Sequence, residues 1–339
     1  MSETEINDYL SKYDEDLANN VIYRVYGMPG PIFMEKNNDT PTPEPPTPGP
    51  DYSEPFYINV RGAVTLEATS GLQMSTDKTN WTDTTATTLS SGKTYFRVAS
   101  DQEVPLKPNW TEKSNSDYDI GGNINSLVKT SFENDTTCYS FSSYFNGKAK
   151  LKNAGNLILP AMTLVDHCYD QMFANCTLLT TSPKLPAITL ADSCYVGMFV
   201  NCTSLTTAPT LPATTLGKWC YSNMFNGCTS LTTAPELPAM IMTHRCYGSM
   251  FNGCTSLTTA PTLPAMTLAD SCYSNMFNGC TNLNYIKCLA TNKTTSEYTN
   301  YWVYGVAATG TFVKDTNMSD WTTGVNGIPE GWTVENATN

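Results

Sequence analysis

Apolar and polar positions recur with a period of 26 residues over the C-terminal half of the chain. The repeating unit reads CYSNMFNGCTSLTTAPTLPAMTLADS, and five copies are nearly identical. A period of this length indicates units that stack on one another, because one unit cannot bury its apolar stripe alone. The two cysteines of each unit then form two columns, which are Cys168, Cys194, Cys220, Cys246 and Cys272, and Cys176, Cys202, Cys228, Cys254 and Cys280.

Within each unit, the pattern predicts a short helix followed by extended chain. Asp192 and Ser193 are suited to cap a helix, because their side chains accept hydrogen bonds from free N–H groups. Cys194, Met198 and Cys202 follow at intervals of four, which would place them on one helical face. The LTTAP segment after them reads as extended, and the prolines of the TLPA segment forbid a continuing helix.

A degenerate unit precedes the five regular ones. It begins at Cys138 and contains the sequences YFNG and LILP, with spacing a few residues longer than the period. Such a departure is expected of a terminal unit that caps the stack.

Residues 51–130 show the alternation and turn signals of strands. The runs FYINV, AVTLEAT and TTLSSGKTYFRVAS are separated by polar and glycine-containing segments. This pattern predicts a small antiparallel β-sandwich.

The first 40 residues differ from the rest. Their apolar positions predict one short helical face, and the segment is too short to bury that face by itself. The Pro-rich stretch PTPEPPTPGP follows as a semi-rigid spacer of about 3.1 Å per residue. We therefore expect a docking peptide that becomes ordered on a partner, the alternative being that it folds back onto the β domain. The residues of this anchor face are Ile6, Tyr9, Leu10, Tyr13 and Leu17.

The phrase MFNGCTSLTTAPTLPAMTL resembles the BspA-like leucine-rich repeats of gut Bacteroides surface proteins and their phages. The closing stretch, which ends in GIPEGWTV, resembles the cap that follows such repeats, so the resemblance covers residues 138–334. It implies binding or adhesion without catalytic residues, as in a head, tail or capsid-attached fibre of a crAss-like Bacteroides phage. Such appendages are commonly homotrimers, so the resemblance also implies a homotrimer.

Together these features predict a mixed β/α fold class. An N-terminal anchor is followed by a β-sandwich, a BspA-like leucine-rich-repeat solenoid and a C-terminal cap. The expected segments are the anchor at 1–35, the Pro-rich linker at 36–52, the β-sandwich at 53–130, the solenoid at 131–287 and the cap at 288–339.

Charge and hydropathy exclude several classes of partner. The chain of 339 residues has a formal net charge of −12 at pH 7 and shows no basic patch. Binding to phosphates requires clustered Lys and Arg, so we expect neither nucleic acid nor anionic membrane as a partner. No run of 18 apolar residues exists, which argues against membrane insertion. The N-terminal sequence lacks a secretory signal, so we expect the protein to reach its station by assembly.

The cysteine columns are the first candidate site. Their spacing of eight residues does not match zinc pairs, which lie two to four residues apart. Free cysteine is among the most buried residue types, so we expect a core ladder without metal or cofactor. Disulfides between neighbouring units remain open as an alternative. His167 and His244 occupy different positions of the unit near no nucleophile, and we expect them on the surface.

Two positions between the tyrosine and the methionine of each unit vary along the array. Variation inside a fixed frame is typical of a recognition face, and it is equally typical of an unconstrained solvated face. Both interpretations stay open. The candidate recognition residues are Asp170, Gln171, Ser222, Asn223, Ser274 and Asn275.

The leading hypothesis is a non-enzymatic display protein of the virion surface. Its N-terminal segment would bind a capsid or tail protein, and its repeats would bind a host-surface protein or glycan. The alternative is an adhesin of the bacterial cell surface. A glycan hydrolase is a third hypothesis, which would need a pair of carboxylates flanking a cleft. The carboxylates available in the β region are Asp77, Asp83, Asp101 and Glu103.

Overall fold

The computed structural model describes residues 51–112, 116–291, 296–318 and 321–337. Residues 49–339 form one compact unit. The predicted anchor segment and the linker up to residue 50 lie outside the described residues. The docking role of Ile6, Tyr9, Leu10, Tyr13 and Leu17 therefore stays a prediction.

Two sheets build the first part of this unit. The strands of the larger sheet are β1 (Tyr57–Val60), β3 (Leu72–Ser75), β4 (Thr82–Asp83), β6 (Gly92–Val98), β8 (Tyr118–Asn123) and β9 (Leu151–Ile158). The strands of the smaller sheet are β2 (Val64–Leu66), β5 (Thr87–Leu89) and β7 (Trp110–Glu112). Their orders are β4-β3-β6-β1-β8-β9 and β5-β2-β7.

Successive side chains of the larger sheet point to opposite faces, and near the middle of the sheet both faces are buried. Phe96 of β6 and Ile58 of β1 are fully buried on the inner face. On the opposite face, Tyr57 pairs with Tyr95 in the antiparallel register; both side chains are buried, and their ring centroids are 5.7 Å apart.

The larger sheet runs directly into the repeats. Strand β8 pairs in parallel with β9, which belongs to the degenerate first unit, and Tyr118 lies opposite Leu151. Between the two strands, the 3-10 helix η1 (Ile124–Leu127) begins after Asn123, whose side chain accepts a hydrogen bond from Asn125 N. The expected division at residue 130 therefore does not coincide with a break in the hydrogen-bonded sheet.

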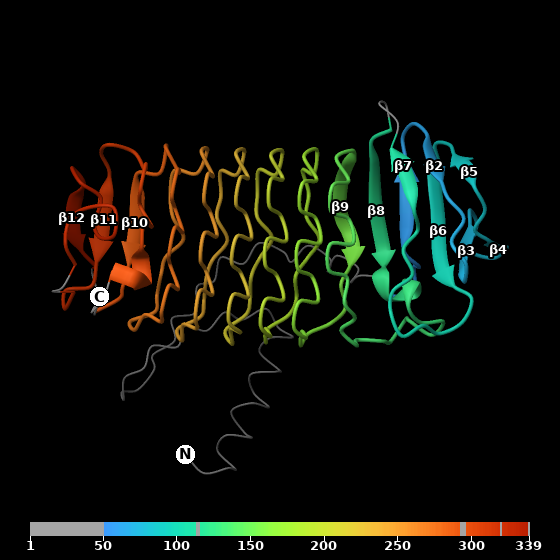
Figure 1. Cartoon of the computed structure of the whole chain (residues 1–339), viewed down its shortest axis with the longest axis horizontal. Coiled ribbons are helices and arrows are strands. Elements are labelled where there is room, and N and C mark those ends of the chain that lie inside the picture. The colour runs from blue at the N-terminus through green and yellow to red at the C-terminus, as the bar shows by residue number, and fades with distance from the viewer. Residues whose placement is uncertain (1–50, 113–115, 292–295, 319–320, 338–339) are drawn as a thin grey trace, which may run out of the picture. The chain divides into compact units, whose positions relative to one another are not determined.

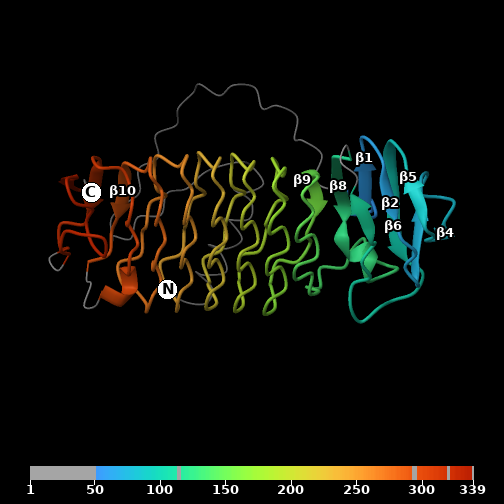
Figure 2. The ribbon, with the colours of Figure 1, turned by 45° about the horizontal axis from the view of Figure 1, so that its top comes forward.

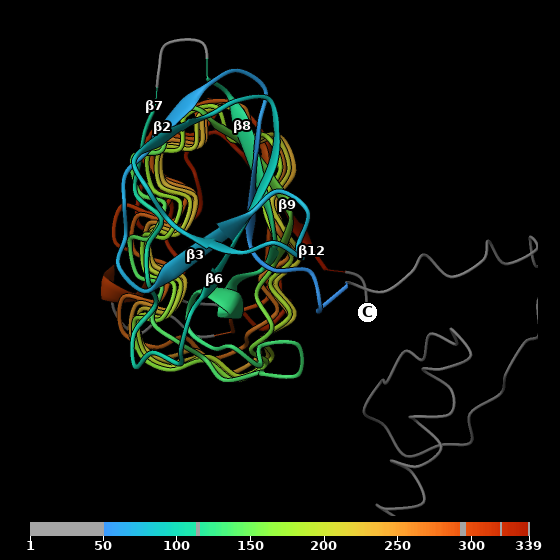
Figure 3. The ribbon, with the colours of Figure 1, turned by 90° about the vertical axis from the view of Figure 1, so that its right-hand side faces the viewer.

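Each 26-residue unit forms one coil, and the coils follow one another in chain order along the long axis (Figures 1 and 2). Seen nearly end-on, the coils superimpose (Figure 3). Isolated parallel bridges join neighbouring coils, for example between Thr189 and Thr215. The last part contains the 3-10 helix η2 (Ser296–Thr299) and a parallel sheet of β10 (Tyr285–Cys288), β11 (Thr311–Lys314) and β12 (Thr333–Asn336).

The predicted mixed β/α fold class is wrong. No α-helix occurs among the described residues, whose regular elements are β-strands and two short 3-10 helices. The segment expected to be helical, residues 194–202, is instead a run of consecutive turns. We call this segment and its equivalents the turn ladder. A leucine-rich-repeat solenoid of helix-and-strand units is therefore not what these residues build.

The turn ladder has a left-handed residue at every fourth position. The φ angle is 55° at Gly197 and 58° at Asn201. The N–H groups between them alternate in direction. That of Met198 donates to Tyr195 O of the same coil at 3.2 Å, whereas that of Phe199 donates to Met224 O of the next coil at 2.9 Å. An α-helix would keep such bonds within one segment, so the alternation is what joins successive coils.

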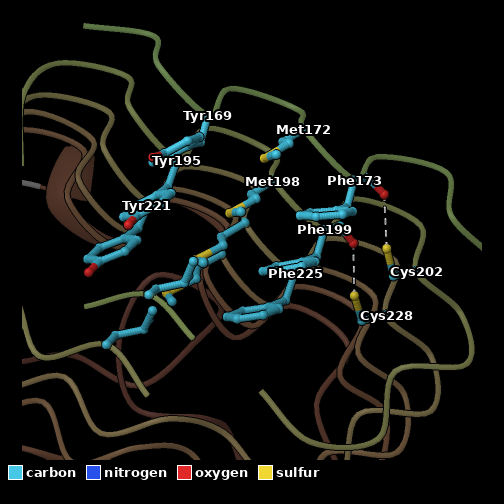
Figure 4. Close-up of a cluster of buried hydrophobic side chains, with 14 of the residues drawn as sticks. Tyr169, Met172, Phe173, Tyr195, Met198, Phe199, Cys202, Tyr221, Phe225 and Cys228 are labelled. Carbon is cyan, nitrogen blue, oxygen red and sulfur yellow. Dashed lines mark hydrogen bonds between the residues drawn. The ribbon is translucent and has the colours of Figure 1, made fainter. Parts of the chain in front are cut away.

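Tyrosine, methionine and phenylalanine columns fill the interior beneath the turn ladder (Figure 4). The rings of Phe199 and Phe225 stack with centroids 5.7 Å apart and planes 3° from parallel. Those of Tyr195 and Tyr221 stack at 5.8 Å and 6°. These four side chains are at most 1% exposed. Stacked buried aromatics contribute both area and ring contacts, so the columns make one continuous interior.

Candidate functional site

The two cysteine columns lie inside this stack. All ten of their cysteines are 0% exposed, and all ten thiols are free. In the second column, each thiol donates to a phenylalanine carbonyl of the preceding coil. The Sγ of Cys202 lies 3.2 Å from Phe173 O, and that of Cys228 lies 3.1 Å from Phe199 O (Figure 4). This column therefore joins neighbouring coils and presents no sulfur to solvent.

Burial also suppresses ionisation of these thiols. It raises the pKa of Cys228 to about 12 and the pKa of Cys246 to about 11. The thiolate is the form that binds metals and attacks electrophiles. The columns are accordingly structural, and the candidate site must lie on the surface.

The predicted recognition residues do not form one exposed face. Ser222 and Ser274 are buried, and the Ser222 hydroxyl donates to Gly248 O of the next coil at 3.1 Å. Asn223 and Asn275 are half-buried and left-handed, with φ of 57° and 55°. Asparagine tolerates this conformation better than most residues, which accounts for its presence without a ligand.

The other two predicted residues differ from each other. Gln171 is exposed. Asp170 is half-buried, which raises the pKa of its carboxyl, and its Oδ2 lies 3.6 Å from Nδ1 of exposed His167. The two positions between the tyrosine and the methionine therefore mostly make contacts between or within coils, and they expose few side chains to a ligand.

Aromatic and charged side chains come together at the corner where each unit ends. Trp219 and Arg245 occupy the last position of consecutive units, and His244 and Asp270 occupy the position before it. The Arg245 guanidinium lies 4.5 Å from the Trp219 ring centre, and the imidazole of His244 lies 5.3 Å from that indole. His244 Nδ1 is 2.8 Å from Asp270 Oδ2. We call these four residues the corner cluster.

The corner cluster is accessible to a ligand. The side chains of His244 and Asp270 are 37% and 55% exposed, and Trp219 and Arg245 are half-buried. The indole offers an apolar surface and one N–H, while guanidinium and carboxylate supply further donors and acceptors. A ring surface beside hydrogen-bonding groups matches the alternating apolar faces and hydroxyls of a sugar.

The corner is also where two units leave the shared sequence. Two of the units end in LADS, whereas the second ends in LGKW and the third in MTHR. These departures fall in neighbouring coils, and the side chains that they introduce contact each other. Treating the two histidines one by one missed this cluster. The available signal was the departure from the consensus in two successive units.

The residue type at position 219 strengthens this assignment. Its φ is 61°, and Ser193 and Ser271 have 58° and 55° at the equivalent position. A bulky residue in the left-handed region is an outlier. The serines show that the coil forms without an indole here, so packing of the coil does not explain the tryptophan. The left-handed conformation itself recurs in every turn ladder, so what distinguishes this position is an indole where two other coils carry serine.

Two of the carboxylates considered for a hydrolase hold loops together. Asp77 accepts hydrogen bonds from the backbone N–H groups of Asn80 and Thr79, each at 2.8 Å, which keep the pKa of its carboxyl well below the usual range. Asp101 accepts from Thr130 N at 2.9 Å, and its pKa is lowered for the same reason. Both carboxylates therefore stabilise the loops in which they lie.

Comparisons of the chain with family models, with curated proteins and with solved structures find no match. Among the described residues, no three or more His, Cys, Asp or Glu gather as a metal site would require. The helices in this part of the chain are too short or too polar to cross a membrane.

Proposed function

We propose that the protein is a non-enzymatic display protein that binds a glycan or a host-surface protein through the corner cluster. The observation that carries the proposal is that Trp219, His244 and Arg245, by which two neighbouring coils depart from the LADS ending, contact one another at one exposed corner. The stacked interior supplies a rigid frame for this corner. Because the frame does not need these side chains, they are free to serve recognition.

The place of action in this proposal is the virion surface. The N-terminal segment binds a capsid or tail protein, and the stack presents the corner cluster outward, as the resemblance to phage and Bacteroides surface repeats suggests. The alternative location is the bacterial cell surface. Mass spectrometry of purified virions and of bacterial envelopes distinguishes the two, because the polypeptide is expected in the first and not in the second.

The binding test uses a variant that restores the consensus. Trp219→Ser, His244→Asp and Arg245→Ser together give both units the residues that their neighbours carry, so the coil should fold. Binding of the full chain to a panel of immobilised polysaccharides, mucins and intact Bacteroides cells should fall at least about tenfold, a change of about 1.4 kcal/mol.

The matched control removes an exposed aromatic elsewhere. Tyr304, in the cap, is 55% exposed, and Tyr304→Ser should leave binding unchanged. Equal binding by the consensus variant and the native chain would contradict the corner as the recognition site. Binding by neither protein to any probe would contradict the glycan and host-cell classes.

A further inference from the structure

A second surface of the coils is apolar and uncovered within the described chain. After the turn ladder, side chains alternate between interior and solvent, as in any extended segment. Leu185 and Ala187 are buried, whereas Lys184 and Ile188 are exposed and Pro186 between them is half-buried. The same alternation in successive coils produces three outward columns.

These columns define what we call the LPA face. Its central column is proline, one flank is apolar and the other carries the only charges of the three columns. The apolar column is Met162, Ile188, Thr214, Met240 and Met266; the proline column is Pro186, Pro212, Pro238 and Pro264; the charged column is Lys184, Thr210, Glu236 and Thr262.

The apolar column is unusually exposed for large side chains. Met162 is 45% exposed, Ile188 52%, Met240 54% and Met266 50%. Beside it, an open hollow lies between two coils, lined in part by the proline and charged columns (Pro212, Pro238, Thr210, Glu236). Four large apolar side chains, each about half exposed, thus lie along one edge of the stack, where a partner could cover them.

The charges on the LPA face are arranged symmetrically. Lys184 lies one coil before Thr210, and Glu236 lies one coil after it. Neither side chain forms an ion pair with another residue of the described ranges. The apolar column has the same centre, because Thr214 lies midway between Met162 and Met266.

We infer that the LPA face binds a second copy of this chain, with the two stacks antiparallel and a two-fold axis at the coil of Thr210 and Thr214. In a two-fold interface each patch meets itself, so residue i contacts j and j contacts i. Lys184 then faces Glu236 of the second copy, and Ile188 faces Met240 of the second copy. Both ion pairs and the whole apolar column are matched at once.

A parallel pairing of the same faces does not give this match. With the axis along the stack, the charged column of one copy lies over the apolar column of the other. Lys184 and Glu236 would then be covered without a partner, which is strongly unfavourable. Electrostatics therefore selects the antiparallel arrangement.

The size of the face sets the expected strength. Coils about 4.8 Å apart give an apolar column roughly 20 Å long, and the three outward positions span roughly 13 Å across it. Such a patch is well below the roughly 800 Å² per partner of a stable interface. The dimer is accordingly weak and dependent on concentration.

Sedimentation velocity of the full chain over a concentration series tests the ion pairs. Lys184→Glu and Glu236→Lys should each raise the dimer dissociation constant about tenfold, and the double exchange should restore it. Met240→Lys should abolish the dimer. Leu178→Lys, which changes a 40% exposed side chain outside the LPA face, is the control and should have no effect. A double exchange that behaves no better than the single variants would overturn the proposal, as would a monomer at every concentration or a trimer.

Crosslinking tests the direction of the pairing. A cysteine at the two-fold axis meets its own copy, so Thr214→Cys should form a disulfide-linked dimer under mild oxidation. Met162→Cys lies four coils from its own copy, a distance of roughly 20 Å, and should not crosslink. The native chain, whose ladder thiols are buried, gives the background. Equal crosslinking of both variants would overturn the proposal, because the antiparallel pair brings only Thr214 next to its own copy, and so would no crosslinking of Thr214→Cys.

Discussion

At the scale of the residue, two side-chain types explain how coils adhere to each other. Left-handed positions such as Asn201 turn the backbone so that alternate N–H groups reach the next coil. Thiols of the second cysteine column add a side-chain bond to the preceding coil, as Cys228 does to Phe199 O. The first column, which includes Cys220, packs in the same interior, but among the described residues the bonds from a thiol to a phenylalanine carbonyl all belong to the second column. The two columns therefore differ in chemistry although they are equally buried.

Serine substitution should separate the two columns. In Cys228→Ser the hydroxyl can donate to the carbonyl that the thiol uses now. In Cys220→Ser the buried hydroxyl has no such acceptor, and an unsatisfied buried polar group costs about 1–3 kcal/mol. Urea unfolding should therefore show Cys220→Ser as the less stable variant by about that amount. The alanine variants at both positions control for loss of the sulfur, and equal stability of the two serine variants would contradict the difference.

At the scale of the element, the coil is the unit that matters. Each coil forms its backbone bonds and ring stacks with neighbours of nearly identical sequence, so one coil can in principle take the place of the next. The stability of such an array is approximately a sum over units and their interfaces.

Removal of one whole coil should therefore be tolerated. Deleting residues 168–193 joins His167 to Cys194 and keeps every column in register. We expect an unchanged circular dichroism spectrum per residue and a cooperative melt shifted downward by a few degrees, since one interface is lost.

A deletion of half a coil is the control. Without residues 168–180, apolar positions of one coil would face polar positions of the next. Cooperative unfolding should be lost. Equal behaviour of the two deletions would contradict the coil as the structural unit.

Stacking and the core columns could be anticipated from the sequence, because both cysteines recur at the same interval. The helix could not be excluded from the sequence. The four-residue spacing of Cys194, Met198 and Cys202 fits the 3.6-residue turn of an α-helix nearly as well as the four-residue repeat of the turn ladder, because the run is so short. No local sequence pattern predicted that β8 pairs with β9. The corner cluster depended on comparing units for differences, and only contacts such as Trp219 with His244 show that the differences form one place.

At the scale of the whole molecule, the interior behaves as one shared environment. Cysteine and tyrosine columns are desolvated together, and burial raises the pKa of their members, for example to about 12 at Cys176 and Cys280. In the unfolded chain these thiols have a pKa of about 8.5. Folding therefore favours the protonated thiol in coil after coil.

This linkage predicts sensitivity to alkali. For a group whose pKa is raised by folding, the stability is complete below the unfolded pKa and is lost as pH rises toward the folded pKa. Each buried thiol should remove about 1.4 kcal/mol per pH unit between about 8.5 and its folded pKa. Urea titrations at pH 7, 8.5, 9.5 and 10.5 should show stability that is flat up to about pH 8.5 and falls steeply above it.

Cys246→Ala provides the control for this prediction. The pKa of Cys246 in the folded chain is about 11. Its removal should therefore reduce the loss of unfolding free energy per pH unit between pH 9 and 10.5 by the contribution of one thiol. Stability that stays constant from pH 8.5 to 10.5 would contradict ionisation of the interior as the cause.

The backbone hydrogen bonds that leave the turn ladder point the same way. Tyr195, Phe199 and Asn201 of one coil donate to the next, and Tyr221 and Phe225 of that coil do likewise. Each peptide carries a dipole of about 3.5 D, so aligned peptides leave partial positive charge at the end facing the C-terminal cap. There Asn326 Oδ1 accepts from Tyr301 N at 2.6 Å, much as a capping side chain ends a helix. One flank of the stack therefore carries a net dipole along the stacking axis. Two such flanks that lie side by side and antiparallel cancel each other's field.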